Sequence, residues 1–92
     1  MILLRLFKVS GHSMEPTLYA GQLILVSFIP YIFNKPKIGD LVVAFDIKRN
    51  IKVIKRVKGV DKNMIYIVSD NIGHGNLRKI DKSKIIGKVV WF

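Results

Sequence analysis

The sequence predicts a mainly β fold, a compact coiled sheet or partial barrel with at most one short helix. Half of its 92 residues are hydrophobic, which is enough for one modest core but not for two. Short runs of β-branched and aromatic residues recur between turn signals, a spacing typical of compact all-β folds. We therefore expect a single domain over residues 1–92.

Six strands are expected along the chain, separated by turns rich in glycine, asparagine and proline. They are Leu6–Ser10, Gln22–Phe28, Asp40–Phe45, Ile51–Val57, Met64–Ser69 and Ile85–Trp91. One short helical turn is expected near Met14–Leu18, because Pro16 is tolerated in the first turn of a helix.

The charge balance is strongly basic. Sixteen Lys and Arg residues against six Asp and Glu give a formal net charge of +10, which favours an anionic partner such as a nucleic acid or an acidic lipid surface. The alternative is an ordinary solvated basic surface. Arginines are few, and basic residues do not alternate with aromatic ones, so no specific nucleic acid is expected. The absence of cysteine excludes disulfides, thiolate metal sites and a cysteine nucleophile. We expect no metal and no cofactor.

The apolar stretches are too short to span a bilayer, which needs about 20 apolar residues. The longest, Leu23–Phe33, is broken by Ser27 and Pro30, and proline disfavours a continuous helix there. We expect a strand followed by an apolar loop. The predicted location is therefore either peripheral at a membrane, with no transmembrane segment, or cytoplasmic.

Lys55 occupies an unusual position in its predicted strand. Alternate strand residues share a face, so Lys55 lies with the apolar Ile51, Val53 and Val57. Burial disfavours a charged ammonium and lowers its pKa. A fall of about 3 units, enough for a base near neutrality, costs about 4 kcal/mol, which proteins seldom accept without chemical use. The alternative is a half-exposed edge lysine whose stem covers apolar surface.

Ser13 lies between Gly11 and Pro16, in a segment suited to a fixed turn that presents a hydroxyl. Such a serine can simply cap a helix. A serine needs an adjacent base to become a nucleophile, and Ser–Lys pairs are a known form of this arrangement. Ser13 and Lys55 together therefore predict a Ser/Lys dyad.

Several segments of this chain resemble the type I signal peptidase family of Ser/Lys peptidases. The strongest match is Gly11–Leu18, with the letters Gly-His-Ser-Met-Glu-Pro-Thr-Leu, followed by the lysine segment Val53–Gly59. Weaker matches, in the expected order, are Pro36–Val43, Ser69–Asn71 and Ile86–Trp91. The chain looks like a minimal member of that family without its membrane anchor.

The resemblance implies site residues. Ser13 would be the nucleophile, Lys55 the general base, and the Ser13 backbone N–H an oxyanion donor. The family often takes a second donor from the position two before the nucleophile, which here is Gly11, so Ser10 or another amide would substitute. Substrate binding or structural support would come from Met14, Pro16, Asp70, Asn71 and Arg78.

The chain departs from the family pattern before Arg78. The family has a Ser-x-Asp-Ser-Arg run there, whose serine orients the lysine, whereas this chain has His74-Gly75-Asn76-Leu77-Arg78. Asn76 would replace the aspartate, and no serine is present. We expect His74 to be an exposed loop residue rather than a support for the lysine, and His12 to be a surface residue.

The implied function is a serine endopeptidase that removes a signal peptide or propeptide from a precursor protein, with small residues at positions −1 and −3. Shallow apolar pockets beside Ser13 and the Asp40–Phe45 strand would accept those residues. One alternative is a domain related to self-cleaving repressors, which is disfavoured because only twelve residues precede Ser13. Another is a non-catalytic basic module that binds lipid or nucleic acid.

Overall fold

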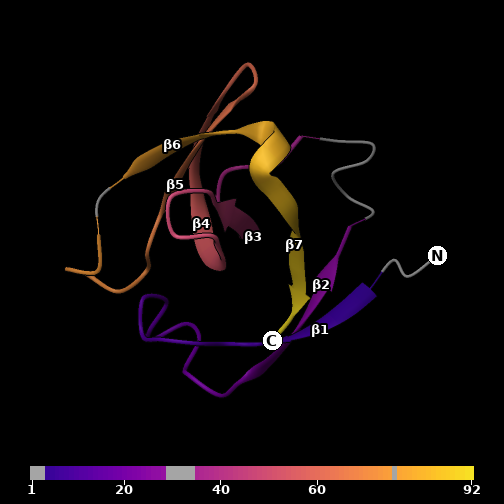
Figure 1. Cartoon of the computed structure of the whole chain (residues 1–92), viewed down its shortest axis with the longest axis vertical. Helices are drawn as coiled ribbons and strands as arrows, with labels where there is room; N and C mark the ends of the chain where they lie inside the picture. The colour runs from indigo at the N-terminus through magenta and orange to yellow at the C-terminus, as the bar shows by residue number, and fades with distance from the viewer. Residues whose placement is uncertain (1–3, 29–34, 76) are drawn as a thin grey trace.

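The computed structural model describes residues 4–28, 35–75 and 77–92. The elements are β1 (Leu4–Lys8), β2 (Leu23–Ser27), β3 (Leu41–Asp46), β4 (Ile51–Asp61), β5 (Met64–Val68), β6 (Arg78–Asp81), the 3₁₀ helix η1 (Lys82–Lys84) and β7 (Ile85–Trp91). All seven strands form one antiparallel sheet in the order β1-β2-β7-β3-β4-β5-β6, which curls into a half-barrel (Figure 1). The predicted mainly β, coiled-sheet fold is confirmed.

All six expected strands are present, but some predicted boundaries were wrong. β4 continues to Asp61, and the expectation missed β6, a four-residue strand. The expected helical turn at Met14–Leu18 is a turn closed by one bond from Leu18 N–H to the Met14 carbonyl, at 3.0 Å. Within the described residues, the helical segment is instead η1, whose start is capped by the Asp81 side chain.

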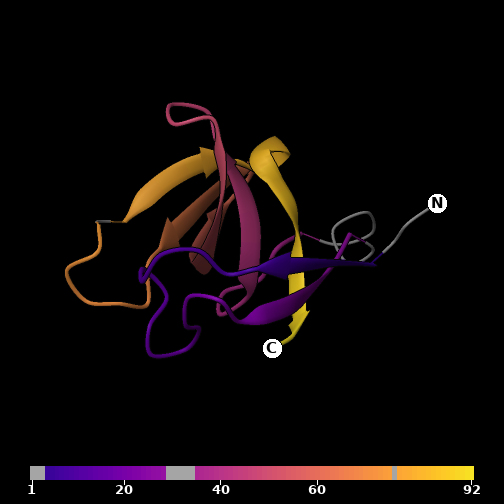
Figure 2. The same ribbon diagram turned by 60° about the horizontal axis from the view of Figure 1, so that its bottom comes forward.

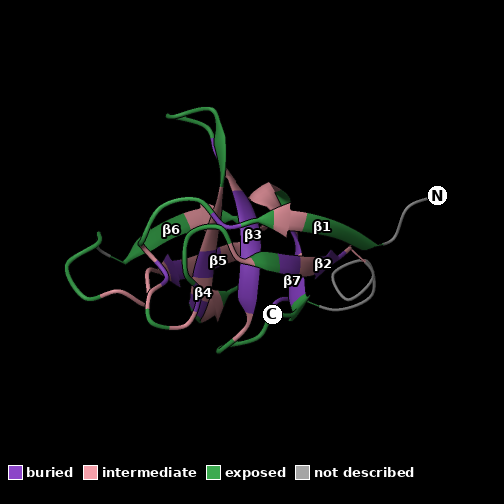
Figure 3. Ribbon diagram, turned by 90° about the horizontal axis from the view of Figure 1, so that it is seen from below, coloured by how far each residue is buried: buried purple, intermediate pink, exposed green. Residues whose placement is uncertain are grey.

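Two hydrophobic clusters lie on opposite faces of the central strands, which are largely buried (Figure 3). The larger joins the Ser13 turn to β2, β3 and β7, and contains Val9, Met14, Leu18, Ile24, Val26, Leu41, Val43 and Val89. The smaller contains Val42, Val57, Ile65 and Ile67. Neighbouring β3 residues alternate between the clusters, as the two-residue repeat of a strand requires.

The register places Lys55 on the face of the smaller cluster. Val42 of β3 lies opposite Lys55 of β4, and Val57 lies opposite Ile67 of β5. Residues directly opposite each other share a face of the sheet. On the face predicted for Lys55, Lys55 and Val57 are buried, Val53 is half-buried and Ile51 is exposed.

The apolar stretch Leu23–Phe33 is described only in part. It begins with β2 as expected, whereas residues 29–33, where the apolar loop was predicted, lie outside the described residues. No helix in the described ranges has the length and apolar character needed to cross a bilayer.

Candidate active site

The turn that carries Ser13 leaves the end of β1 and runs beside the loop after β5 (Figure 2). Gly11 begins it with a φ of 78°, a conformation that glycine adopts at little cost. Asn71 holds the turn from the other side: its backbone N–H donates to the Ser13 carbonyl at 2.9 Å, and its side chain donates to the His12 carbonyl at 2.8 Å. Met14 is buried beneath the turn. These contacts fix the backbone on both sides of the hydroxyl.

Asp70 links the same turn to β4. It accepts a hydrogen bond from Thr17 at 2.6 Å and two from the Arg56 guanidinium, at 3.2 and 2.7 Å. Arg56 also donates to the Gly39 carbonyl at 2.8 Å. The Arg56 hydrogen bonds hold the pKa of the Asp70 carboxyl below its usual range. Because Arg56 follows Lys55 directly, this ion pair fixes the distance between turn and lysine strand.

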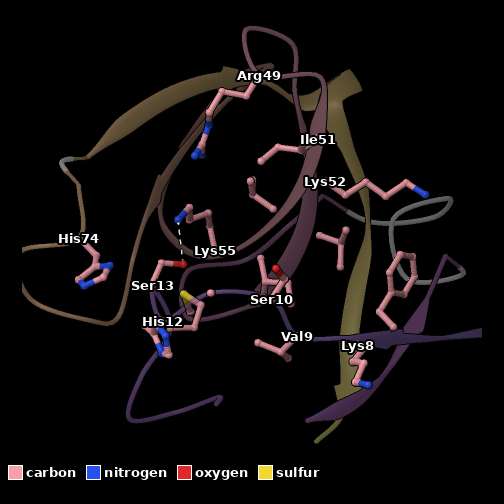
Figure 4. Close-up of a pocket in the computed structure, with 16 residues that line it drawn as sticks. Lys8, Val9, Ser10, His12, Ser13, Arg49, Ile51, Lys52, Lys55 and His74 are labelled. Atoms are coloured by element: carbon pink, nitrogen blue, oxygen red, sulfur yellow. Dashed lines mark hydrogen bonds between the residues drawn. The ribbon is translucent and has the colours of Figure 1, made fainter. Parts of the chain in front are cut away.

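Lys55 reaches Ser13 from the facing wall (Figure 4). Its side-chain nitrogen Nζ lies 3.3 Å from Ser13 Oγ and 2.8 Å from Ser69 Oγ, and the residue is only 8% exposed. Burial lowers its pKa, and the nearby positive charges of Arg49 and Arg78 lower it further, against an opposing effect of Asp46. A lysine with these surroundings can serve as a neutral base beside a hydroxyl.

Ser69 is the lysine partner that the sequence interpretation missed. The family resemblance implies a supporting serine just before Arg78, where this chain has none, and it assigns no role to Ser69. The register of β4 and β5 brings the two residues together. Arg56 pairs with Val68, so Lys55, which precedes Arg56, lies beside Ser69, which follows Val68. A regular pairing of the two strands from their hairpin would have set Lys55 opposite Asp70, and the bulge between Val57 and Gly59 shifts the register so that Lys55 lies beside Ser69.

A charge cluster lies behind the lysine. Asp46, 6% exposed, accepts hydrogen bonds from the Arg49 side chain at 3.0 Å and from Arg78 at 3.2 Å. Both arginines lower its pKa, to about 2. Arg78 was predicted as a support residue, but its carboxylate partner comes from the end of β3. Asn76, expected in that role, lies outside the described residues.

A groove of about 510 Å³ opens at the dyad (Figure 4). One wall is residues 7–14 and the other is residues 51–55, with Val43 between them and Arg49 and His74 near the dyad. The expected specificity strand Asp40–Phe45 thus contributes only Val43 to this lining. A second cavity of about 260 Å³ adjoins Lys55, Ser69 and Arg78.

Both walls present strand edges that the sheet leaves unpaired. β1 is an edge strand, and β5 begins to pair with β4 only at Arg56, so residues 51–55 are bonded on the β3 side alone. Val9 directs its N–H and carbonyl away, to Gln22 and Gly21. Backbone groups alternate in direction along a strand, so those of Lys8 and Ser10 face the groove. The groove can therefore accept an extended peptide.

The other predicted residues are distributed unevenly. Ser10 and Gly11 line the groove, and no acceptor among the described residues is bonded to the Ser13 backbone N–H. Pro16 is exposed and lies outside the groove lining. His74 is an exposed loop residue, as expected, but it also lines both cavities. His12 is exposed and pairs with Glu15 at 2.5 Å.

Comparison with models of protein families gives a match over most of the chain. The family model described as "Signal peptidase, peptidase S26" matches residues 1–74, well over half of the chain and both dyad residues. No curated protein matches the chain. On the family match, this chain belongs to the signal peptidase family, peptidase S26.

Proposed function

We propose that this chain is a serine endopeptidase that uses Ser13 as nucleophile and Lys55 as general base to remove a signal peptide or propeptide from a precursor protein. The observation that carries the proposal is the buried Lys55 nitrogen, which lies within hydrogen-bond reach of Ser13 Oγ. Its lowered pKa supports a role as base rather than as a salt-bridge cation.

In the proposed reaction, neutral Lys55 accepts the Ser13 proton while Ser13 Oγ attacks the scissile carbonyl. Ser69 orients the lysine nitrogen by its hydrogen bond at 2.8 Å. The Ser13 N–H, with a second donor from the Ser10–Gly11 segment, stabilises the developing oxyanion. Protonated Lys55 then gives its proton to the leaving amine, and water hydrolyses the acyl-enzyme.

The substrate is proposed to lie extended between the two unpaired strand edges, with backbone hydrogen bonds to both walls. Side chains two residues apart in an extended peptide point the same way, so positions −1 and −3 would face one wall together. Val43, Val53 and Ile54 make that region apolar. We expect small residues to be preferred there, and equal cleavage after large residues would disprove this preference.

A peripheral position at an anionic membrane is also proposed, on the outer face of β1, β2 and β7. Leu6 lies opposite Leu25, and Leu25 lies opposite Trp91, so one face gathers apolar side chains. Leu6 is 62% exposed and Trp91 59%. Trp91 is the sole tryptophan. Its fluorescence should shift to the blue on anionic vesicles, and an unchanged spectrum would rule the membrane position out.

The decisive experiment is cleavage of a precursor peptide with an Ala-x-Ala site, in neutral detergent, by the wild type, Ser13→Ala and Lys55→Met. Each substitution should lower kcat/KM by about a thousandfold or more, because either loss removes the activated nucleophile. The wild-type rate should rise with pH as Lys55 becomes neutral. Lys62→Met, in the turn between β4 and β5, is the matched control. Equal rates for all four proteins would overturn the proposal.

A further inference from the structure

The groove is lined by positive charge with no acidic residue in its lining. Its ionisable side chains are Lys8, His12, Arg49, Lys52, Lys55 and His74. All six acidic residues of the chain lie elsewhere, namely Glu15, Asp40, Asp46, Asp61, Asp70 and Asp81. A peptide bound there meets a cationic field that low-dielectric walls concentrate.

The cations at the two ends of the groove differ in their partners. At the dyad end, Arg49 is paired with Asp46. At the far end, the Lys52 nitrogen lies 5.4 Å from the centre of the Phe7 ring, and the Arg5 guanidinium lies 5.2 Å from the same centre. Among the described residues, no carboxylate forms an ion pair with Lys8, Lys52 or Arg5. In the part of the chain that the structure describes, Lys52 and Arg5 share the Phe7 ring and have no carboxylate partner, so an anionic group of a bound peptide could pair with them.

Resting on the proposed peptidase function, we propose that this far end selects precursor segments that carry an aspartate or glutamate three to five residues from the bond that is cut. Lys52 precedes Lys55 by three residues, about 10 Å along an extended strand. An extended substrate that lies beside β4 has the same rise per residue as the strand. A carboxylate at that spacing therefore lies level with Lys52 on one wall of the groove, with Lys8 on the facing wall, while the scissile carbonyl is at Ser13.

The test compares Ala-x-Ala peptides that differ only in carrying Glu, Gln or Lys three, four or five residues from the scissile bond, on either side. In neutral detergent at low salt, the best Glu peptide should exceed its Gln counterpart by about two- to fivefold in kcat/KM for each ion pair formed. Added salt should reduce this preference. Lys52→Gln and Lys8→Gln should each weaken it, whereas Lys62→Gln, at the opposite end of β4, should retain it. Lys52→Glu should favour the Lys peptide.

Equal cleavage of the Glu, Gln and Lys peptides would overturn the inference while leaving the peptidase function intact. If the wild type cuts none of the peptides, the peptidase proposal fails.

The acidic preference is then tested separately by peptide binding to Ser13→Ala. Fluorescence anisotropy measures the affinity of this variant for labelled Glu and Gln peptides. Tighter Glu binding that Lys52→Gln abolishes supports the acidic preference, and equal binding of the two peptides contradicts it.

Discussion

The turn that carries Ser13 and the strand that carries Lys55 meet at one hydrogen bond, yet they are held in opposite ways. The turn is fixed by well-matched partners: Asn71 donates to its carbonyls, and Asp70 joins Thr17 to Arg56. Lys55 is buried with a hydroxyl as its near partner and with two guanidinium groups nearby. One half of the site is stabilised by paired charge and the other carries a cation that burial disfavours.

This contrast indicates that the turn sets the position of Ser13, whereas the surroundings of Lys55 set the reactivity of its amine. In the proposed reaction Ser13 must keep a fixed distance from its base, and hydrogen bonds and an ion pair hold the turn of Ser13 in place. As the proposed base, Lys55 needs the reverse, since a carboxylate partner would keep its amine protonated. We therefore expect changes on the turn side to cost stability, and changes on the lysine side to alter catalysis and its pH dependence.

The largest effect on stability is expected for Asp70→Asn. The change removes the negative charge that pairs with Arg56, a partly buried pair at 2.7 Å, so the free energy of unfolding at pH 7 should fall by about 2 kcal/mol. The folded pKa of Asp70 is lowered. Its contribution is therefore present above the unfolded pKa, near 3.9, and is lost as pH falls through the folded value.

Urea unfolding of the two proteins between pH 2 and 7 measures this difference. Asp61→Asn is the matched control, since Asp61 is an exposed residue at the end of β4, and it should change stability by less than about 0.5 kcal/mol. If Asp70→Asn is as stable as the control at pH 7, the ion pair does not hold the turn.

Ser69→Ala sharpens the comparison from the lysine side. Loss of the 2.8 Å hydrogen bond leaves the Lys55 nitrogen free to rotate away from Ser13, so kcat should fall about tenfold, equivalent to about 1.4 kcal/mol. KM should change little. Ser69→Thr keeps the hydroxyl and should restore most of the rate, which a purely structural role would not explain. A fully active Ser69→Ala variant would show that Ser69 does not position Lys55 for the reaction.

Ser13 and Lys55 could be predicted as candidate site residues because each lies in a distinctive local sequence pattern. Ser13 stands in a glycine- and proline-bounded turn, and Lys55 interrupts an apolar face whose period of two follows from strand geometry. The strands were predictable for the same reason. The short β6 gave no signal, since its residues Arg78–Asp81 include three charged side chains.

The residues that tune the lysine were not predictable from such signals. Asp46 follows an apolar strand and Arg49 stands in a hairpin, and neither position is unusual until the sheet curls and brings them to Arg78. Ser69 required the register between β4 and β5, which has a bulge between Val57 and Gly59. Pairing register and curvature are set by long-range packing, so local patterns cannot supply them.

The smallest effect is expected for Lys55→Met, as a change in the free energy of unfolding. The sign of this change distinguishes the Lys55 strand from the Ser13 turn. Because the folded pKa of Lys55 is lowered, folding is penalised at pH values below that pKa, where the buried amine is charged. The penalty declines as pH rises from the folded pKa towards the unfolded value near 10.4. Lys55→Met removes it, so the variant should be more stable than the wild type at pH 7, by about 1 kcal/mol.

That advantage should narrow as the pH approaches 10, and urea unfolding at several pH values measures it. Lys52→Met, an exposed lysine of the same strand, should show no such narrowing. A variant that is less stable than the wild type at every pH would mean that the ammonium stabilises the fold through its hydrogen bonds to Ser13 and Ser69. Lys55 would then be a structural cation, and the contrast between the turn and the strand would disappear. A more stable but inactive variant would instead show that the chain retains Lys55 at a cost to its own stability, for its chemistry.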